Sequence, residues 1–98
     1  MILVTGAVLA RPETLEEVLH LSLEHVRRSR AEPGCLSHDV YADCENPLRL
    51  CFTERWSDAA ALRAHFAVPE SGAFVQALGR LAAAPPELAI YEAAELKL

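Results

Sequence analysis

The sequence predicts a single α+β domain with a ferredoxin-like split βαβ arrangement and a four-stranded antiparallel sheet. Three observations lead to this prediction. The chain has 98 residues, the size of one domain, so residues 1–98 are expected to form a single unit. Apolar residues make up 52% of the chain, which is enough for a folded core. Strand and helix patterns follow in the order strand, helix, strand, strand, helix, strand.

The N-terminal part of the chain predicts a strand followed by a helix. Residues 2–10 form a β-branched run that is apolar on both alternating faces, which is typical of a central strand. Thr14 followed by Glu17 gives the capping-box pattern that opens a helix. The helix is expected to end near Glu32, because a Pro-Gly pair follows.

The middle of the chain predicts a hairpin. Residues 35–43 and 48–56 alternate between apolar and polar side chains, and a turn signal at 45–47 separates them. The first of these two strands carries acidic residues and a histidine, which is typical of a strand at the edge of a sheet.

The rest of the chain predicts a second helix, a short helical stretch and a last strand. Asp58 is expected to cap the second helix, in which Leu62 and Phe66 would face inward. Residues 70–84 form the helical stretch, which is expected to be broken at its two glycines. Residues 88–96 are the predicted fourth strand.

Two helices can cover only one face of a four-stranded sheet, yet the first strand is apolar on both faces. Val4 and Val8 lie on one face of this strand, and Leu3 and Leu9 lie on the other. A bare apolar face of that size is unusual for a soluble monomer. The sequence therefore predicts a homodimer in which two sheets pack face to face.

The charge balance argues against nucleic acid and membrane partners. Nine basic residues against fourteen acidic residues give a net charge of −5, so no concentrated basic face is expected. The basic residues Arg27, Arg28 and Arg30 are expected to form a solvated helix end. No run approaches the ~20 apolar residues of a membrane span, and the first ten residues do not resemble a signal peptide. A cytoplasmic location is expected.

The cysteines and histidines give no sign of a metal site. Cys35, Cys44 and Cys51 are odd in number and lack CxxC spacing, so neither a disulfide framework nor a zinc site is expected. His20 and His25 are five residues apart and are expected to point to different helix faces. We therefore expect reduced thiols and no bound metal.

Several short motifs resemble one known family. They are EPGCLSHDVY at residues 32–41, ERWSD at 54–58, LRAHF at 62–66 and Pro69. In this order and at this spacing they resemble the antibiotic biosynthesis monooxygenase (ABM) domain. The resemblance covers nearly the whole chain and implies a dimeric α/β barrel. Members of the family include cofactor-independent oxygenases of quinols and aromatic polyketides, haem-degrading enzymes and an isomerase of a sugar phosphate.

The chain also departs from the family pattern. The family commonly has His-Phe after Pro69, where this chain has Glu-Ser. The haem-degrading members of the family use an asparagine on the first strand and an axial histidine in the last helical segment. Residues 2–10 contain no asparagine and residues 70–81 contain no histidine, so haem degradation is not expected. Phe52 and Leu62 stand where the polyketide-type oxygenase has polar residues.

An oxygenase without a cofactor uses its substrate as the reductant, so the protein must supply a base and an aromatic pocket. Trp56, His65 and His38 are the expected catalytic residues. Trp56 would stack on an aromatic substrate or simply close the core. His65 would act as general base, or it would only cap a carbonyl or face solvent. If His38 pairs with Thr53 in the hairpin, His38 points away from Trp56 while Tyr41 points toward it.

The expected substrate-binding residues are aromatic. Tyr41 and Phe52 come from the hairpin, and Phe66 and Phe74 come from the helical segments. Apolar residues at helical spacing are also typical of plain core packing, so this alternative stays open.

Two further features belong to the expected site. Residues 68–72, with a proline and a glycine, would form an entrance loop. Glu54 shares a strand face with Trp56 and is expected to pair with an arginine or to orient a base.

The sequence thus favours a cofactor-independent monooxygenase that acts with O₂ on a small quinol, polyphenol or aromatic polyketide-like substrate. One alternative is a non-catalytic dimeric module that binds a small molecule in the same cavity. Another is an isomerase or lyase of a small carbonyl metabolite, which would need a base but no oxygen.

Overall fold

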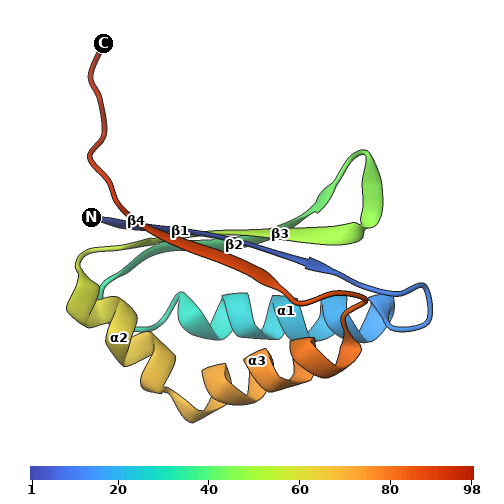
Figure 1. The fold of residues 1–98 in the computed structure, drawn as a ribbon. Coiled ribbons are helices and arrows are strands. Elements are labelled where there is room, and N and C mark those ends of the chain that lie inside the picture. Colours follow the sequence, from blue (N-terminus) through green and yellow to red (C-terminus); the bar gives the residue numbers. More distant parts are fainter.

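The computed structural model describes residues 1–98 and shows one antiparallel sheet with three helices packed on one face (Figure 1). The strand order is β2-β3-β1-β4, so β1 is central and β2 lies at an edge. The predicted ferredoxin-like α+β fold is confirmed. The elements are β1 (Ile2–Leu9), α1 (Leu15–Ser29), β2 (Cys35–Asp43), β3 (Asn46–Trp56), α2 (Ala59–Ala67), α3 (Pro69–Leu81) and β4 (Glu87–Glu92).

The C-terminal third differs from the prediction in two ways. The helical stretch is not broken: α3 runs without interruption through Gly72 and Gly79, and begins with Pro69, which suits the first turn of a helix. The expected entrance loop at residues 68–72 is therefore mostly the first turn of α3. The last strand is shorter than predicted and ends at Glu92.

The start of α1 is held by a tertiary contact and not by the predicted capping box. The Thr14 hydroxyl makes no capping bond within α1. It instead donates to the carbonyl of Leu81 at 2.9 Å and accepts from the backbone N–H of Arg11 at 3.0 Å. Thr14 therefore joins the beginning of α1 to the end of α3. Asp58 behaves as predicted, since its carboxylate accepts the backbone N–H of Ala61 at 2.8 Å and caps α2.

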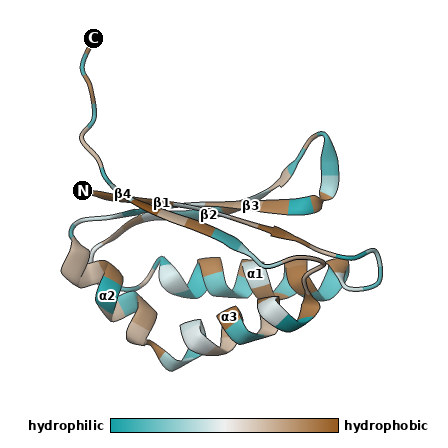
Figure 2. Cartoon of the chain, in the orientation of Figure 1, coloured by the Kyte–Doolittle hydropathy of each residue, from teal (hydrophilic) through white to brown (hydrophobic).

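The core lies between the sheet and the helices and has an apolar part at each end of a polar middle. Figure 2 shows the apolar stretches of the strands above the helices. The larger apolar cluster contains Val8, Ala10, Val18, Val26, Leu50, Phe52, Leu78 and Leu81. The smaller one contains Ile2, Val4, Trp56 and Leu62.

The register of the β2–β3 hairpin decides which hairpin residues reach the core. His38 lies opposite Glu54 and not opposite Thr53, so the expected register was wrong by one residue. The cause is the turn: Asp43 pairs with Asn46, and the ladder shifts just before Asp43. A shift of one residue moves a side chain to the other face of the sheet. His38 therefore points toward the helices.

The opposite face of the sheet carries no helix (Figure 1). Leu3 and Leu9 are half-buried on this face, and Tyr91 is exposed. Tyr41 is also exposed here, and its hydroxyl lies 2.6 Å from the Thr53 hydroxyl. Residues 93–98 project away from the sheet on this side.

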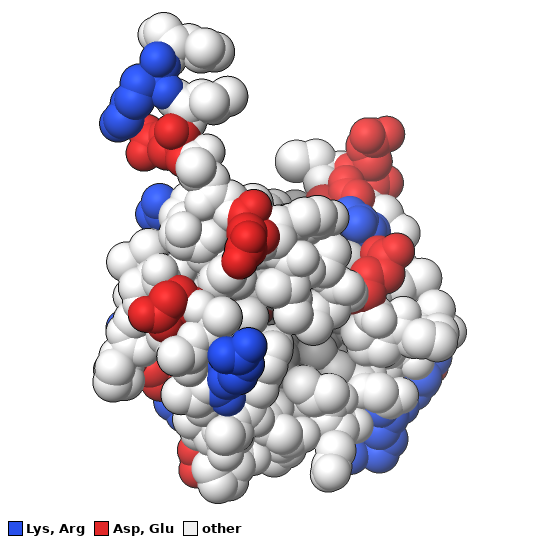
Figure 3. Space-filling view, turned by 60° about the vertical axis from the view of Figure 1, so that its left-hand side comes forward, with Lys and Arg blue, Asp and Glu red and all other residues white.

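On the face shown in Figure 3, acidic and basic side chains are separated by uncharged areas, and a few basic ones lie together at its lower right edge. None of the helices combines the length and the apolar character that crossing a membrane requires.

Gly34, in the turn before β2, is the glycine whose replacement we expect to be most costly. It has φ +81°, and an added Cβ would lie 2.5 Å from the Cβ of Ala61 and 2.7 Å from the hydroxyl of Ser57. Gly34→Ala should lower the free energy of unfolding by about 2–4 kcal/mol in denaturant titrations. The control is Gly72→Ala, which meets open space in α3 and should raise this free energy by up to about 1 kcal/mol. Equal effects of the two substitutions would contradict the argument.

Candidate active site

A buried polar cluster lies in the middle of the core, and we call His25, His38 and His65 the histidine cluster. Their ring centroids are 5.2 Å apart for His25 and His38, 5.2 Å for His25 and His65, and 5.6 Å for His38 and His65. The residues come from α1, β2 and α2 and are 5%, 1% and 2% exposed. Three imidazoles that are far apart in the sequence therefore share one water-poor space.

The carboxylate of Glu54 is the acceptor that the cluster surrounds. Its Oε1 accepts the indole N–H of Trp56 at 2.9 Å, and the same oxygen lies 3.3 Å from Nε2 of His38 and 3.9 Å from Nε2 of His65. Burial alone raises the pKa of Glu54, but the nearby imidazole of His38, the hydrogen bond from Trp56 and the charge of His65 outweigh it. The net pKa is lowered, so Glu54 carries a buried negative charge.

His65 is oriented by a second carboxylate. Its Nδ1 lies 2.9 Å from Oε1 of Glu32, a residue of the turn between α1 and β2. A carboxylate oxygen only accepts, so Nδ1 of His65 carries the proton. In the neutral ring this leaves Nε2 as the lone-pair nitrogen, on the side of Glu54.

His25 has the opposite arrangement. The guanidinium of Arg28 donates to its Nδ1 at 2.7 Å, and a guanidinium has no acceptor, so the neutral His25 ring carries its proton on Nε2. The ring stacks on Phe74 with centroids 4.1 Å apart. Burial, followed by the charges of His38, His65 and Arg28, lowers the pKa of His25 to about 3. His25 is therefore a neutral ring at any physiological pH.

Several polar atoms of this region have no hydrogen-bond partner in the protein. Both ring nitrogens of His38 are in this state, because the 3.3 Å approach to Glu54 is not aligned as a hydrogen bond. Oε2 of Glu32 is another such atom. Buried polar groups are normally paired, so these atoms indicate binding capacity that the chain itself does not use. The remaining atoms are Oγ of Ser22, Nε of Arg28 and Oγ of Ser71.

A cavity of about 420 Å³ reaches the cluster from the surface. It lies between α2 and the turn before β2, and both Glu32 and His65 line it. Its volume falls within the ~300–1,000 Å³ of small-molecule sites. Its other lining residues are Pro33, Gly34, Ser57, Asp58, Ala60, Ala61, Ala64 and Val68.

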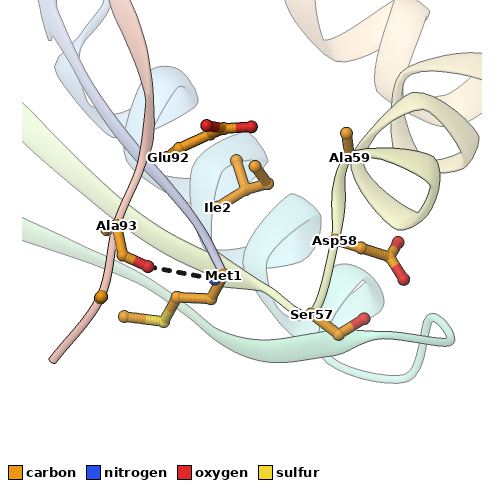
Figure 4. Close-up of a pocket in the computed structure, with 8 residues that line it drawn as sticks. Met1, Ile2, Ser57, Asp58, Ala59, Glu92 and Ala93 are labelled. Carbon is orange, nitrogen blue, oxygen red and sulfur yellow. Dashed lines mark hydrogen bonds between the residues drawn. The ribbon is translucent and has the colours of Figure 1, made fainter.

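A second cavity, of about 500 Å³, lies at the N-terminus and away from the cluster (Figure 4). Met1 and Ile2 lie beside Glu92 and Ala93 on one side of it, and Ser57, Asp58 and Ala59 lie on the other side. The N-terminal amino group donates to the carbonyl of Ala93 at 3.1 Å. No histidine lines this second cavity. The cavity lined by Glu32 and His65 is therefore the better candidate for a site of proton transfer.

Three predicted catalytic residues come together, although not all in the expected way. His65 and His38 meet in the cluster, and Trp56 lies beside His65 with ring centroids 4.6 Å apart. Trp56 is fully buried and its N–H is used by Glu54, so it neither faces a cavity nor is free to bind a substrate. No arginine of the same chain pairs with Glu54, which instead accepts from Trp56 and lies 3.3 Å from His38.

None of the four aromatic residues expected to bind substrate lines the 420 Å³ cavity. Phe52 and Phe74 lie together in the apolar core, with ring centroids 6.1 Å apart. Tyr41 lies on the outer face of the sheet, because the hairpin register differs from the expected one. Phe66 is 45% exposed, because α2 turns His65 and not Phe66 toward the core.

Two residues of the cluster region are not among the predicted site residues. The spacing of His25 from His20 shows no ligand pattern, but the partners of His25 lie on other elements. The expectation of no metal pair among the histidines considered spacing along the chain alone, whereas three of them meet in space. Glu32 lies at the predicted helix end, and its place in a motif before Pro33-Gly34 is a signal that could have identified it.

The fold and this centre define the class of protein, a small ferredoxin-like α+β domain with a buried cluster of histidines and carboxylates between its sheet and its helices. The chain belongs to the antibiotic biosynthesis monooxygenase family, whose model matches residues 1–77.

Individual relatives agree with this placement. An uncharacterized Synechocystis protein is 38% identical over 96% of this chain, which spans 64% of that relative's length. The candidate monooxygenase YcnE of Bacillus subtilis is 28% identical over 97% of this chain and 100% of its own.

Solved structures share the fold over the full chain. A Deinococcus radiodurans protein, described as a candidate antibiotic biosynthesis monooxygenase, superposes with a TM-score of 0.94 at 28% identity, covering 100% of this chain and 97% of its own. A crystal structure described as an antibiotic biosynthesis monooxygenase gives 0.88 at 29% identity, covering 97% and 100%.

The neutral, buried state of His25 predicts a loss of stability on acidification. In the unfolded chain His25 binds a proton with a pKa near 6.5, whereas in the folded chain its pKa is about 3. Between these values only the unfolded state is protonated, so the free energy of unfolding falls as the pH falls through this window. Glu54 adds to the loss only below its ordinary value of 4.5. Relative to His25→Gln, the wild type should lose about 1.4 kcal/mol per pH unit between about pH 6 and 4.5 in denaturant titrations with chelator present.

The matched control is His20→Gln, which removes an exposed histidine from the same helix. Its unfolding free energy should follow that of the wild type across the window. Parallel curves for the wild type and His25→Gln would show that His25 is not held neutral.

Proposed function

We propose that the chain is a cofactor-independent monooxygenase that oxidises a small quinol or polyphenol with O₂, and that Glu32 and His65 form its base. The observation that carries this proposal is the pairing of these two residues at 2.9 Å on the wall of the 420 Å³ cavity. A carboxylate held by an imidazole, next to a space for a ligand, is an arrangement that supports general base catalysis.

The proton acceptor in this proposal is the carboxylate of Glu32, which lines the cavity. Oε1 accepts from Nδ1 of His65, and Oε2 is buried without a partner in the protein. A phenol bound in the cavity would give its proton to this carboxylate and become a phenolate. The N–H of His65 stabilises the ionised carboxylate beforehand and fixes its direction.

The phenolate is the reductant for oxygen. One oxygen atom of O₂ enters the ring and the other leaves as water, so a hydroquinone becomes a hydroxyquinone and supplies all the electrons for both atoms. Glu32 returns its proton to the departing oxygen. No added cofactor is needed, because the substrate itself is oxidised.

Oxygen consumption with a hydroquinone tests the proposal. Glu32→Gln keeps the shape of the side chain but removes the base, and should lower the rate by about 100-fold or more. His65→Gln should also lower the rate, while His20→Gln should match the wild type because His20 is exposed on α1 and outside the cavity. Unchanged uptake in Glu32→Gln would remove this residue from the mechanism. Tight quinol binding without oxygen uptake by the wild type would instead support a binding module.

We also propose that two copies pair through the helix-free face of the sheet. Leu3, Leu9 and Tyr91 leave an apolar strip on this face, and the tail carries exposed Leu96 and Leu98. A twofold pair would cover this strip with the same strip of a second copy.

Light scattering of the purified chain should give twice the 10.7 kDa of one chain. Leu3→Glu places a charge in the proposed interface and should yield monomers at micromolar concentration. Leu19→Glu replaces an exposed leucine of α1 and should remain dimeric. A wild type of single-chain mass would contradict the pairing.

A further inference from the structure

The geometry points to a binding site for a divalent transition metal ion at the centre of the histidine cluster. This inference does not rest on the proposed oxidation, because it concerns metal binding itself. It uses the side of His65 that faces Glu54, whereas the proposed base uses the side that faces Glu32.

The first argument is the convergence of donor atoms. His25, His38 and His65 can each offer one ring nitrogen so that the three nitrogens lie within 4.8 Å of one another. Three imidazoles around one point are the ligand set of many zinc sites, and small shifts of the rings would bring them to the usual Zn–N distance of ~2.0–2.1 Å. Imidazole donors favour Zn²⁺, Ni²⁺, Co²⁺ or Cu²⁺ over Mg²⁺ or Ca²⁺.

The second argument is the unused capacity of His38. The residue is 1% exposed, and neither of its nitrogens has a hydrogen-bond partner. An imidazole with two free nitrogens in a core is costly unless something outside the chain pairs with it. A metal ion would pair with one of them.

The third argument is the surrounding charge. Glu54 lies 3.3 Å from His38 and 3.9 Å from His65, and Glu32 lies 2.9 Å from His65. These two carboxylates together offset the two positive charges of a divalent ion. Glu32 also accepts a hydrogen bond from Nδ1 of His65. A carboxylate in this position is the usual second-sphere partner of a metal-bound histidine.

Arg28 sets a condition on the site. Its guanidinium donates to Nδ1 of His25, which leaves the proton of that ring on Nε2. His25 can bind a metal through Nε2 only if this proton moves to Nδ1 and Arg28 turns away. Arg28 therefore weakens metal binding in two ways, because it donates to Nδ1 of His25 and because it is positively charged. Replacing Arg28 with a hydrogen-bond acceptor should raise the affinity for the metal ion.

Calorimetric titration of the full chain with Zn²⁺, after treatment with chelator, tests the inference. The wild type should bind one ion per chain, and His38→Ala should weaken binding at least about tenfold. Arg28→Gln should tighten it by about tenfold, because a glutamine can accept the Nδ1 proton of His25. His20→Gln removes the exposed His20–Glu24 pair and should leave binding unchanged.

Two further measurements keep the test decisive. Co²⁺ in place of Zn²⁺ should give visible absorption bands in the wild type that are absent in His65→Gln, and circular dichroism should show each variant folded. Loss of binding in His20→Gln would assign the ion to the surface of α1 and overturn the inference. Absence of stoichiometric Zn²⁺ binding by the wild type would overturn it as well.

Discussion

The buried negative charge of Glu54 is the constraint on which the rest of the structure depends. A carboxylate in a core is stable only if polar groups stabilise it, and here the indole N–H of Trp56 donates to Glu54 while His38 and His65 lie 3.3 and 3.9 Å away. These three side chains come from three elements, β3, β2 and α2. The charge therefore specifies how the hairpin and α2 meet, and it divides the apolar core into two parts.

The same constraint gives the site its chemistry. Each histidine meets a different neighbour: Glu32 for His65, Arg28 for His25, and Glu54 for His38. Nδ1 of His65 meets a carboxylate and carries the proton of that ring, whereas Nδ1 of His25 meets a guanidinium and carries none. The two neighbouring rings therefore hold different neutral tautomers. A small domain thus holds several imidazoles in different, defined states within one enclosed space.

The sequence predicted most of the fold because its signals are local. The Asp58 cap and the apolar face of β1 each depend on a few neighbouring residues, and both appear as expected. The site was harder to predict because it depends on contacts between distant segments. One residue of register placed His38 inside and Tyr41 outside, and His25 joined partners from other elements that no spacing within α1 could show.

The proton positions on the histidine rings test the central claim most directly. Nitrogen-15 NMR of the metal-free chain at neutral pH distinguishes the two neutral tautomers and the protonated form of each ring. The account predicts a proton on Nδ1 of His65, directed at Glu32, and on Nε2 alone of His25, opposite Arg28. A doubly protonated His25, or a His65 with its proton only on Nε2, would contradict it.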